Sequence, residues 1–380
     1  MLKQDRPFQV FLKPAGSACN LKCSYCYYPD TKNLTRKAGL IVMPDDILEK
    51  YIIDHFKASS GPDYFFSWHG GEPTLAGIDF YRRAVSFQKR HKPSDGNVIN
   101  GIQSNGTMID DEWCRFFSEE NFYVGVSIDG PEDLHNSSRL TAAGGPSFNK
   151  TMAGYEKLRQ YGIRNEILCV VRNENAGKPL EVYRFFKSLG AQFLTFLPLV
   201  IQNKNGKDAD PDHSVEPEAF GKFLCTIFDE WEEEDVGKIR IQIIEEAIGT
   251  VFRNDHTLCI FKKICGGVPV VEINGDFYSC DHYVDGNHLI GNITQNTLAQ
   301  MLDSEAQAAF GEAKFKTLPD YCLRCGVLDM CNGECPRNRF IFSPDGEPGL
   351  NYLCSGYKKF FNHIRPFTEA VAAEWKSQKS

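Results

Sequence analysis

The sequence lacks the features that mark membrane, nucleic-acid-binding and exported proteins. None of its 380 residues belongs to a stretch approaching the roughly 18 uninterrupted apolar residues of a membrane-spanning helix. It has no run rich in Lys and Arg, and 42 basic against 50 acidic residues give a net charge of -8, which argues against nucleic acid or membrane as a partner. The N-terminal segment MLKQDRPFQVFLKP contains no apolar signal region. We therefore expect a cytoplasmic protein whose partners are protein or small molecule.

Cysteine, by contrast, is abundant, with 14 in the chain. Cytosolic thiols are kept reduced, so metal binding or catalysis is a better explanation for them than disulfide bonds. The hydrophobic content of 42% and the charged content of 24% are ordinary for a globular enzyme. At this length the chain can form one large domain and a smaller one.

Residues 8 to 200 alternate between apolar strand-like segments and segments of helical periodicity. The predicted strands are Phe8–Leu12, Tyr64–Trp68, Val98–Gln103, Tyr123–Ile128, Ile167–Val171 and Phe193–Leu197. Helices are predicted at Pro44–Phe56, Phe80–His91, Asp110–Glu120 and Pro179–Leu189. Six βα units predict an α/β fold, a parallel sheet that curls into a partial (β/α)6 barrel of the TIM type.

Small or polar clusters follow each predicted strand directly. They are a cysteine loop, HGGEP, QSNGT, SIDGP, VRNEN and PLV. Parallel strands end at one rim, and barrel enzymes have their active sites at that carboxyl rim. We therefore expect the chemistry of this protein to lie there.

The character of the sequence changes after residue 200. Residues 202–218 have the composition of an exposed loop, and a helix is predicted at Pro217–Glu233. From Cys259 onward the chain is rich in cysteine, with a hairpin in which Asn274 and Gly275 suit a type I′ turn and a final helix near Tyr357–Trp375. We predict a barrel domain over 1–235, including the loop, and a cysteine-rich domain over 236–380.

The first cysteine motif is Cys19-x3-Cys23-x2-Cys26, directly after the first strand. Three thiolates can hold three irons of a 4Fe-4S cluster and leave the fourth iron open for catalysis. On its own the motif could also be part of a zinc site or a chance spacing. Its place after strand one, and the pair Tyr27-Tyr28 that could pack on an adenine ring, favour the cluster.

With Gly70-Gly71-Glu72-Pro73 one βα unit later, this motif resembles the radical S-adenosylmethionine superfamily. The resemblance implies that the open iron chelates the amino and carboxylate groups of S-adenosylmethionine. It also implies that the glycine-rich segment approaches the methionine ammonium, which glycine permits.

Eight further cysteines lie in the C-terminal region: Cys259, Cys265, Cys280, Cys322, Cys325, Cys331, Cys335 and Cys354. Eight thiolates suffice for two fully ligated 4Fe-4S clusters. The pairs Cys322-x2-Cys325 and Cys331-x3-Cys335 alone would also suit a structural zinc site, but Cys335-Pro336 ends the run as in ferredoxin motifs. Cys114, Cys169 and Cys225 remain, and we expect them to be packing residues.

The spacing of the eight cysteines resembles the SPASM extension of peptide-modifying radical enzymes. That resemblance implies one cluster on Cys259, Cys265, Cys280 and Cys335 and another on Cys322, Cys325, Cys331 and Cys354, hence three 4Fe-4S clusters in all. Along nearly its whole length the chain resembles the anaerobic sulfatase-maturating enzymes, through KPAGSACNLKCSYCYY, WHGGEPTLAG, IQSNGT, VGVSIDGP, CNGECPRNR and GEPGLNYLC. The resemblance implies oxidation of a Cys or Ser in a sulfatase to formylglycine, with an electron donor such as flavodoxin or ferredoxin.

Further site residues follow from this resemblance. It implies that S-adenosylmethionine is contacted by Tyr25, Gly71, Ser127, Arg139 and Val200, although Val200 offers only apolar contact and suits a core position as well. Asp281 matches the family's proposed general base, a role that suits a carboxylate beside an electron-accepting cluster. A position that merely hydrogen-bonds near the metal is the alternative for Asp281, and His282 is a second candidate base.

Other polar residues have less specific signals. Gln103 and Asn105, at the end of strand three, could bind cofactor or substrate or be ordinary strand-end residues. Acidic residues of the loop after strand six could meet a substrate Arg: Asp208, Asp210, Asp212 and Glu216.

Two competing functions remain open. A maturase of another ribosomally made peptide would share these motifs, but many such enzymes begin with a peptide-recognition module, and the first strand here is predicted from Phe8. An electron-transfer protein would need no cluster with an open iron. The sequence does not distinguish a Cys target from a Ser target.

Overall fold

The computed structural model describes residues 8–26, 28, 41–203, 209–210, 213–252 and 255–378. Its contacts divide the chain into two compact units. Unit 1 comprises Met1–Ser127, Asn136–Asn165 and Gly266–Gly311, and unit 2 comprises Ile128–His135, Glu166–Cys265 and Glu312–Ser380. Each unit therefore combines segments from both halves of the sequence.

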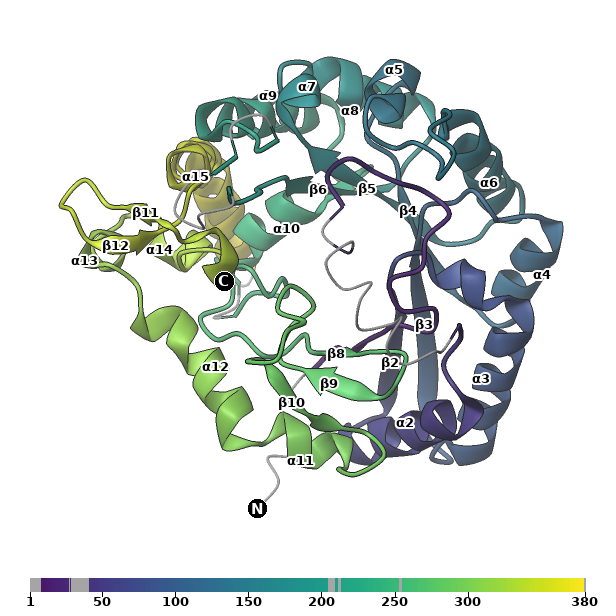
Figure 1. Ribbon diagram of the computed structural model, residues 1–380. Helices are drawn as coiled ribbons and strands as arrows, with labels where there is room; N and C mark the ends of the chain where they lie inside the picture. The colour runs from purple at the N-terminus through teal and green to yellow at the C-terminus, as the bar shows by residue number, and fades with distance from the viewer. Residues whose placement is uncertain are drawn as a thin grey trace. The chain divides into compact units, whose positions relative to one another are not determined.

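Unit 1 contains a sheet of strands in the order β10-β9-β8-β1-β2-β3-β4. Their bounds are β1 Phe11–Leu12, β2 Asp63–Trp68, β3 Asn97–Ser104, β4 Tyr123–Ser127, β8 Val270–Val271, β9 Asp276–Tyr278 and β10 Leu289–Asn292. Strands β1 to β4 pair in parallel, β8 adds to β1 in parallel, and β9 and β10 continue antiparallel. Figure 1 shows β8, β9 and β10 side by side. The parallel register brings the carboxyl ends of β1 to β4 to one edge, as predicted.

Helices connect these strands and cover the sheet of unit 1. They are α2 Asp45–Ala58, α3 Ile78–His91, α4 Asp111–Glu119, α6 Phe148–Gln160 and α11 Leu298–Leu302, with a short η2 at Pro73–Ala76. Asp110 caps α4 by accepting hydrogen bonds from the amides of Glu112 and Trp113. The core between helices and sheet is aromatic, with buried Tyr51, Phe66, Trp68 and Tyr81 in edge-to-face and stacked contacts. This packing makes the sheet a rigid support for the loops at its edge.

Unit 2 contains the parallel strands β5 Asn165–Val171, β6 Phe193–Pro198 and β7 Arg240–Ile241. Its helices are α7 Asn173–Ala176, α8 Pro179–Ser188, α9 Pro217–Glu234, α10 Gln242–Gly249, α13 Asp320–Leu323, α14 Leu328–Cys331 and α15 Cys354–Ser377, with η3 at Pro336–Asn338 and a hairpin of β11 Ile341–Phe342 and β12 Pro348–Leu350. Two further helices contain residues of both units, α5 Glu132–Asn136 and α12 Glu305–Lys316. Figure 1 shows α15 alongside α9, where Gly221 meets Gly356.

The six predicted strands and the named helices are confirmed, with ends that differ by a few residues. The first strand is shorter than predicted and spans Phe11–Leu12 only, although Gln9 N still donates to Gly267 O of the neighbouring segment. The predicted type I′ turn at Asn274 and Gly275 is wrong. That turn needs positive φ at both residues, and here Gly275 alone has it, at +85°. Gly275 N instead bonds Glu272 O, which makes Gly275 the bulge residue after an ordinary turn.

Candidate active site and cluster sites

The loop that carries Cys19 lies directly against the GGEP segment. Gly71 N donates to Gly16 O at 2.9 Å and Glu72 N donates to Ala18 O at 2.7 Å. A Cβ at Gly71 would lie 2.3 Å from Ala18 O, so glycine is required here because backbone meets backbone. The glycine of this motif thus holds the cysteine loop in place, a role that the sequence did not indicate.

The three cysteines of this loop are close enough to influence one another. Burial raises the pKa of the Cys19 thiol to about 12, and the charges of Glu72, Cys23 and Cys26 add to the shift. A buried thiol of this kind is deprotonated when a metal cation takes the place of its proton. The donor set and its surroundings fit the cluster predicted for Cys19, Cys23 and Cys26.

Glu72 is a fully buried carboxylate that joins the ends of β2 and β3. It accepts hydrogen bonds from the Thr74 hydroxyl at 2.6 Å, the Ser104 hydroxyl at 2.9 Å and the Asn105 amide N at 2.7 Å. Burial raises the pKa of Glu72, while these hydrogen bonds act in the opposite direction. The sequence alone did not assign this role to Glu72, although a carboxylate between Gly71 and Pro73 in a small-residue segment was a usable signal.

Gln103 and Asn105 both find protein partners at this edge. Asn105 Nδ2 donates to Asn20 Oδ1 at 2.8 Å and lies 3.8 Å from the Cys19 sulfur. Gln103 Nε2 donates to the Ser127 hydroxyl at 3.1 Å. Asn105 therefore supports the cysteine loop, and a role for either residue in ligand binding stays a prediction.

Four of the five residues predicted to contact S-adenosylmethionine lie in unit 1. The buried Arg139 places its guanidinium 5.5 Å from the centre of the Tyr25 ring, a cation–π contact that orients both side chains. Ser127 ends β4, and Gly71 lies in the GGEP segment described above. Val200 is buried in unit 2 just after β6.

Asp281 is buried and ion-paired. Its Oδ1 lies 2.7 Å from the Lys13 ammonium, which also lies 2.9 Å from Glu272 Oε1. The Tyr28 hydroxyl donates to Asp281 Oδ2 at 3.1 Å and lies 3.2 Å from His69 Nδ1. Asp281 is thus fixed on two sides, whereas the alternative base His282 is exposed.

Lys13 and Tyr28 are functional neighbours that the sequence did not assign. Lys13 is completely buried, and although burial lowers the pKa of its ammonium, Asp281 and Glu272 together raise it above the usual value. The sequence suggested that Tyr28 packs on an adenine ring, but its hydroxyl donates a hydrogen bond to the Asp281 carboxylate. Tyr27 lies outside the described residues. A lysine inside the apolar segment VFLKP was the signal that could have revealed the ion pair.

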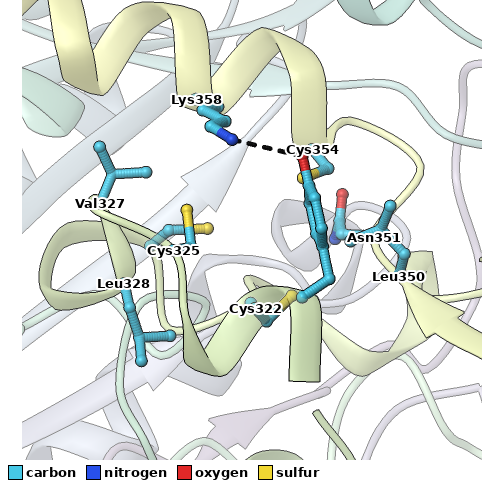
Figure 2. A pocket seen from close by; sticks show the side chains of 11 residues that line it. Cys322, Cys325, Val327, Leu328, Leu350, Asn351, Cys354 and Lys358 are labelled. Atoms are coloured by element: carbon cyan, nitrogen blue, oxygen red, sulfur yellow. Dashed lines mark hydrogen bonds between the residues drawn. The ribbon is translucent and has the colours of Figure 1, made fainter. Parts of the chain in front are cut away.

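The structure brings four of the eight C-terminal cysteines into one pocket of unit 2. Cys322, Cys325, Cys331 and Cys354 line it together with Tyr321 and Lys358, as Figure 2 shows for the labelled residues. Cys354 is the first residue of α15 and Cys331 the last of α14. Burial raises the pKa of Cys354 to about 11 and also raises that of Cys322. Four cysteines that line one pocket fit the second predicted cluster of this region.

Three ligands predicted for the other C-terminal cluster also lie in unit 2. The charges of Cys265, Cys259 and Cys335 all act on the ammonium of Lys314, so each of these cysteines lies near that side chain. Cys280 lies in unit 1 just after β9 and directly before Asp281.

The remaining cysteines behave largely as expected. Cys114 and Cys169 are fully buried, which confirms them as packing residues. Cys225, on α9, is only partly buried.

Asp208 and Asp212 of the acidic loop lie outside the described residues, and Asp210 forms an ion pair with His213 at 3.0 Å.

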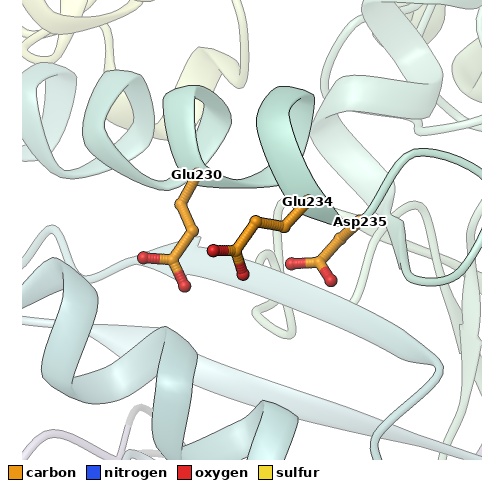
Figure 3. Close-up of side chains that lie close together, drawn as sticks. All are labelled: Glu230, Glu234 and Asp235. Carbon is orange, nitrogen blue, oxygen red and sulfur yellow. The ribbon is translucent and has the colours of Figure 1, made fainter.

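Glu230, Glu234 and Asp235 form the one other group of potential metal ligands among the described residues (Figure 3). The Lys187 ammonium lies within 3.1 Å of all three carboxylates, and Arg184 pairs with Glu230 at 2.8 Å. Because Lys187 and Arg184 on α8 pair with these carboxylates, the group joins α8 to the end of α9.

Family models and relatives agree with this geometry. The radical SAM superfamily model matches residues 14–186, and the iron-sulfur cluster-binding domain SPASM matches residues 265–326. The serine-type anaerobic sulfatase-maturating enzyme of Bacteroides thetaiotaomicron is 42% identical over 389 residues, which cover 99% of this chain and 94% of that one. The cysteine-type enzyme of Clostridium perfringens is 32% identical, with coverage of 95% and 97%.

Solved structures confirm the fold. The enzyme named anSMEcpe, with bound AdoMet and Cp18Cys peptide, matches with a TM-score of 0.86 at 31% identity, covering 97% of this chain and 99% of that one. SuiB of Streptococcus suis, bound to S-adenosylmethionine, shares the fold with a TM-score of 0.66 at 13% identity. The predicted partial barrel with a C-terminal SPASM domain is thereby confirmed.

None of the helices in the described part of the chain combines the length and apolar character that crossing a lipid bilayer requires. The sequence motifs, the site at the sheet edge and the relatives that match nearly the whole chain all indicate the same family. The chain belongs to the anaerobic sulfatase-maturating enzymes of the radical S-adenosylmethionine superfamily.

Proposed function

We propose that this protein oxidises a Cys or Ser side chain of a sulfatase polypeptide to 3-oxoalanine, that is, formylglycine. The observation that carries the proposal is the buried Asp281 carboxylate, held by Lys13 and Tyr28 next to the predicted cluster ligand Cys280. The relatives named as sulfatase-maturating enzymes support the same reaction. A maturase of another ribosomally made peptide is the alternative.

The cofactor sites are part of this proposal. Cys19, Cys23 and Cys26 hold a cluster with an open iron, and Tyr25, Gly71, Ser127, Arg139 and Val200 contact S-adenosylmethionine. Two fully ligated 4Fe-4S clusters are held by Cys259, Cys265, Cys280 and Cys335 and by Cys322, Cys325, Cys331 and Cys354. When bound, the clusters and S-adenosylmethionine supply the 5′-deoxyadenosyl radical and a place for one electron.

Asp281 acts on the substrate after hydrogen abstraction. One hydrogen atom leaves the target Cβ and ends in 5′-deoxyadenosine, so the substrate radical must still lose one electron and one proton, the latter from its hydroxyl or thiol. Asp281 takes the proton as general base, and Lys13 and Tyr28 hold its carboxylate in position. A Ser target then yields the aldehyde directly, whereas a Cys target yields a thioaldehyde that water converts to the aldehyde with release of hydrogen sulfide.

Partners and location complete the proposal. The substrate is a sulfatase polypeptide, a flavodoxin or ferredoxin supplies the electron for cofactor cleavage, and neither nucleic acid nor membrane takes part. The cysteines proposed as cluster ligands must stay reduced to bind iron, which suits the reducing conditions of the cytoplasm. The domain boundary near residue 235 stays a prediction.

The test uses peptides with Cys or Ser followed by x-Pro-x-Arg, incubated with reduced, cluster-loaded enzyme and S-adenosylmethionine. We expect the Ser peptide to lose two hydrogens by mass and the Cys peptide to exchange sulfur for oxygen as well. A peptide with Ala in place of the target Cys or Ser is the matched control and should stay unchanged. Cofactor cleavage without modification of either peptide would overturn the sulfatase assignment and favour the alternative.

A further inference from the structure

Lys314, on α12, is a buried cation among the cysteines of unit 2. It is 1% exposed, and its ammonium donates to the backbone oxygens of Cys259 at 2.9 Å and Ile260 at 2.7 Å. Burial lowers the pKa of Lys314, and the charges of Cys265, Cys259 and Cys335 oppose that effect. The ammonium is thus fixed beside three ligands of one proposed cluster.

Arg339 is a second cation in the same region. Its Nε donates to Gly333 O at 2.7 Å, Nη2 donates to Asn332 O at 3.0 Å, and Nη1 donates to Lys314 O. Burial lowers its pKa, and Cys322, Cys331 and Cys265 are among the groups whose charges oppose this. Cys265 belongs to one proposed ligand set and the other two to the second, so Arg339 adds positive charge near both.

One buried acid accompanies these cations. Glu334 is 2% exposed and accepts hydrogen bonds from the amides of Asn338 and Asn351. Burial raises its pKa, which disfavours its charged form. Two cations, Lys314 and Arg339, therefore lie close to the proposed ligands.

We propose that the Lys314 ammonium raises the reduction potential of the cluster for which Cys259, Cys265 and Cys335 are proposed as ligands, with Arg339 acting in the same sense. This inference rests on the proposed cluster sites. Reduction adds one negative charge to a cluster, and a nearby positive charge in a medium of low dielectric constant stabilises that form. Cys280 precedes the proposed base Asp281, so the residues that prepare this cluster to receive one electron serve the substrate oxidation.

The test separates charge from shape at position 314. Lys314→Met and Lys314→Gln both remove the positive charge, and Lys314→Gln retains a polar group. Lys314→Arg keeps the positive charge. Lys316→Met is the matched control, because Lys316 lies on the same helix with its side chain 70% exposed and paired with Glu312. Midpoint potentials are measured by anaerobic redox titration followed by electron paramagnetic resonance, with iron and sulfide counted in the same samples.

We expect full iron content in all variants. One midpoint should become more negative in both charge-removing variants, with at least a tenfold fall in the reduced-to-oxidised ratio at fixed potential, which is about 59 mV for one electron. Lys314→Arg and Lys316→Met should leave the potentials unchanged.

Unchanged potentials in Lys314→Met and Lys314→Gln would overturn the proposal. An equal shift in Lys314→Arg would also overturn it, because shape rather than charge would then be responsible. Iron loss in every Lys314 variant would make the lysine a structural support instead. Failure of the proposed function would look different, as a wild-type enzyme that cleaves the cofactor but modifies neither peptide.

Discussion

At the scale of single residues, Asp281 separates hydrogen abstraction from proton removal. Asp281→Asn keeps the shape of the side chain and removes the base. We expect 5′-deoxyadenosine to form still, while aldehyde product falls by roughly 10²-fold or more, the usual scale for a lost general base. Chromatography of both products in one reaction measures this, and unchanged product would reduce Asp281 to a residue near the metal.

Lys13 gives a second prediction at this scale, because its removal leaves Asp281 and Glu272 buried without their cation. Lys13→Met should destabilise the protein by on the order of 3–5 kcal/mol, measured by anaerobic denaturant unfolding. Lys89→Met, which breaks an exposed pair with Glu120, should cost only about 0–1 kcal/mol. Equal losses in the two variants would contradict the importance of the buried ion pair.

At the scale of elements, the contact between the GGEP segment and the cysteine loop can be tested by adding one methyl group. Gly71→Ala places a Cβ against Ala18 O and must displace the loop of Cys19. We expect loss of about four irons and of cofactor cleavage. Gly101→Ala is the control, because its Cβ would meet nothing within 4 Å in β3. Iron retained in Gly71→Ala would mean that the loop tolerates the shift.

The packing of α9 on α15 offers a corresponding test in unit 2. A Cβ at Gly356 would lie 2.2 Å from Pro217 O, so Gly356→Ala should cost about 1–3 kcal/mol by overpacking. Because Cys354 is only two residues away, iron at that site should fall as well. Gly177→Ala, with nothing within 4 Å, should leave both stability and iron content unchanged.

At the scale of the whole molecule, three clusters imply about 12 iron and 12 sulfide per chain and no stoichiometric zinc. Replacing Cys19, Cys23 and Cys26 together with Ala should leave about eight irons and abolish formation of 5′-deoxyadenosine. Elemental analysis and cofactor-cleavage assays check both statements. About four irons with one or two zincs in the wild type would refute the C-terminal assignment.

Much of this molecule could be predicted from sequence because its signals are local. Strands such as Val98–Gln103 are apolar runs, and the spacing of Cys322, Cys325 and Cys331 fits within one short stretch. Lys13 could not be paired with Asp281 beforehand, because that contact depends on β8 adding to β1 across most of the chain. The turn at Gly275 was misjudged, since its dipeptide suits two turn types and only the backbone angles separate them.

Cys354 begins the helix α15, and the same first turn contacts α9 through Gly356. If Cys354 binds iron as proposed, docking of α15 and occupation of that site are a single linked equilibrium, since whatever favours one favours the other. Iron supply then becomes a condition for completing the fold. Without iron, the 24 residues of α15 would be loosely held. Damage by oxygen to the metal bound at Cys354 would then unfold the whole helix.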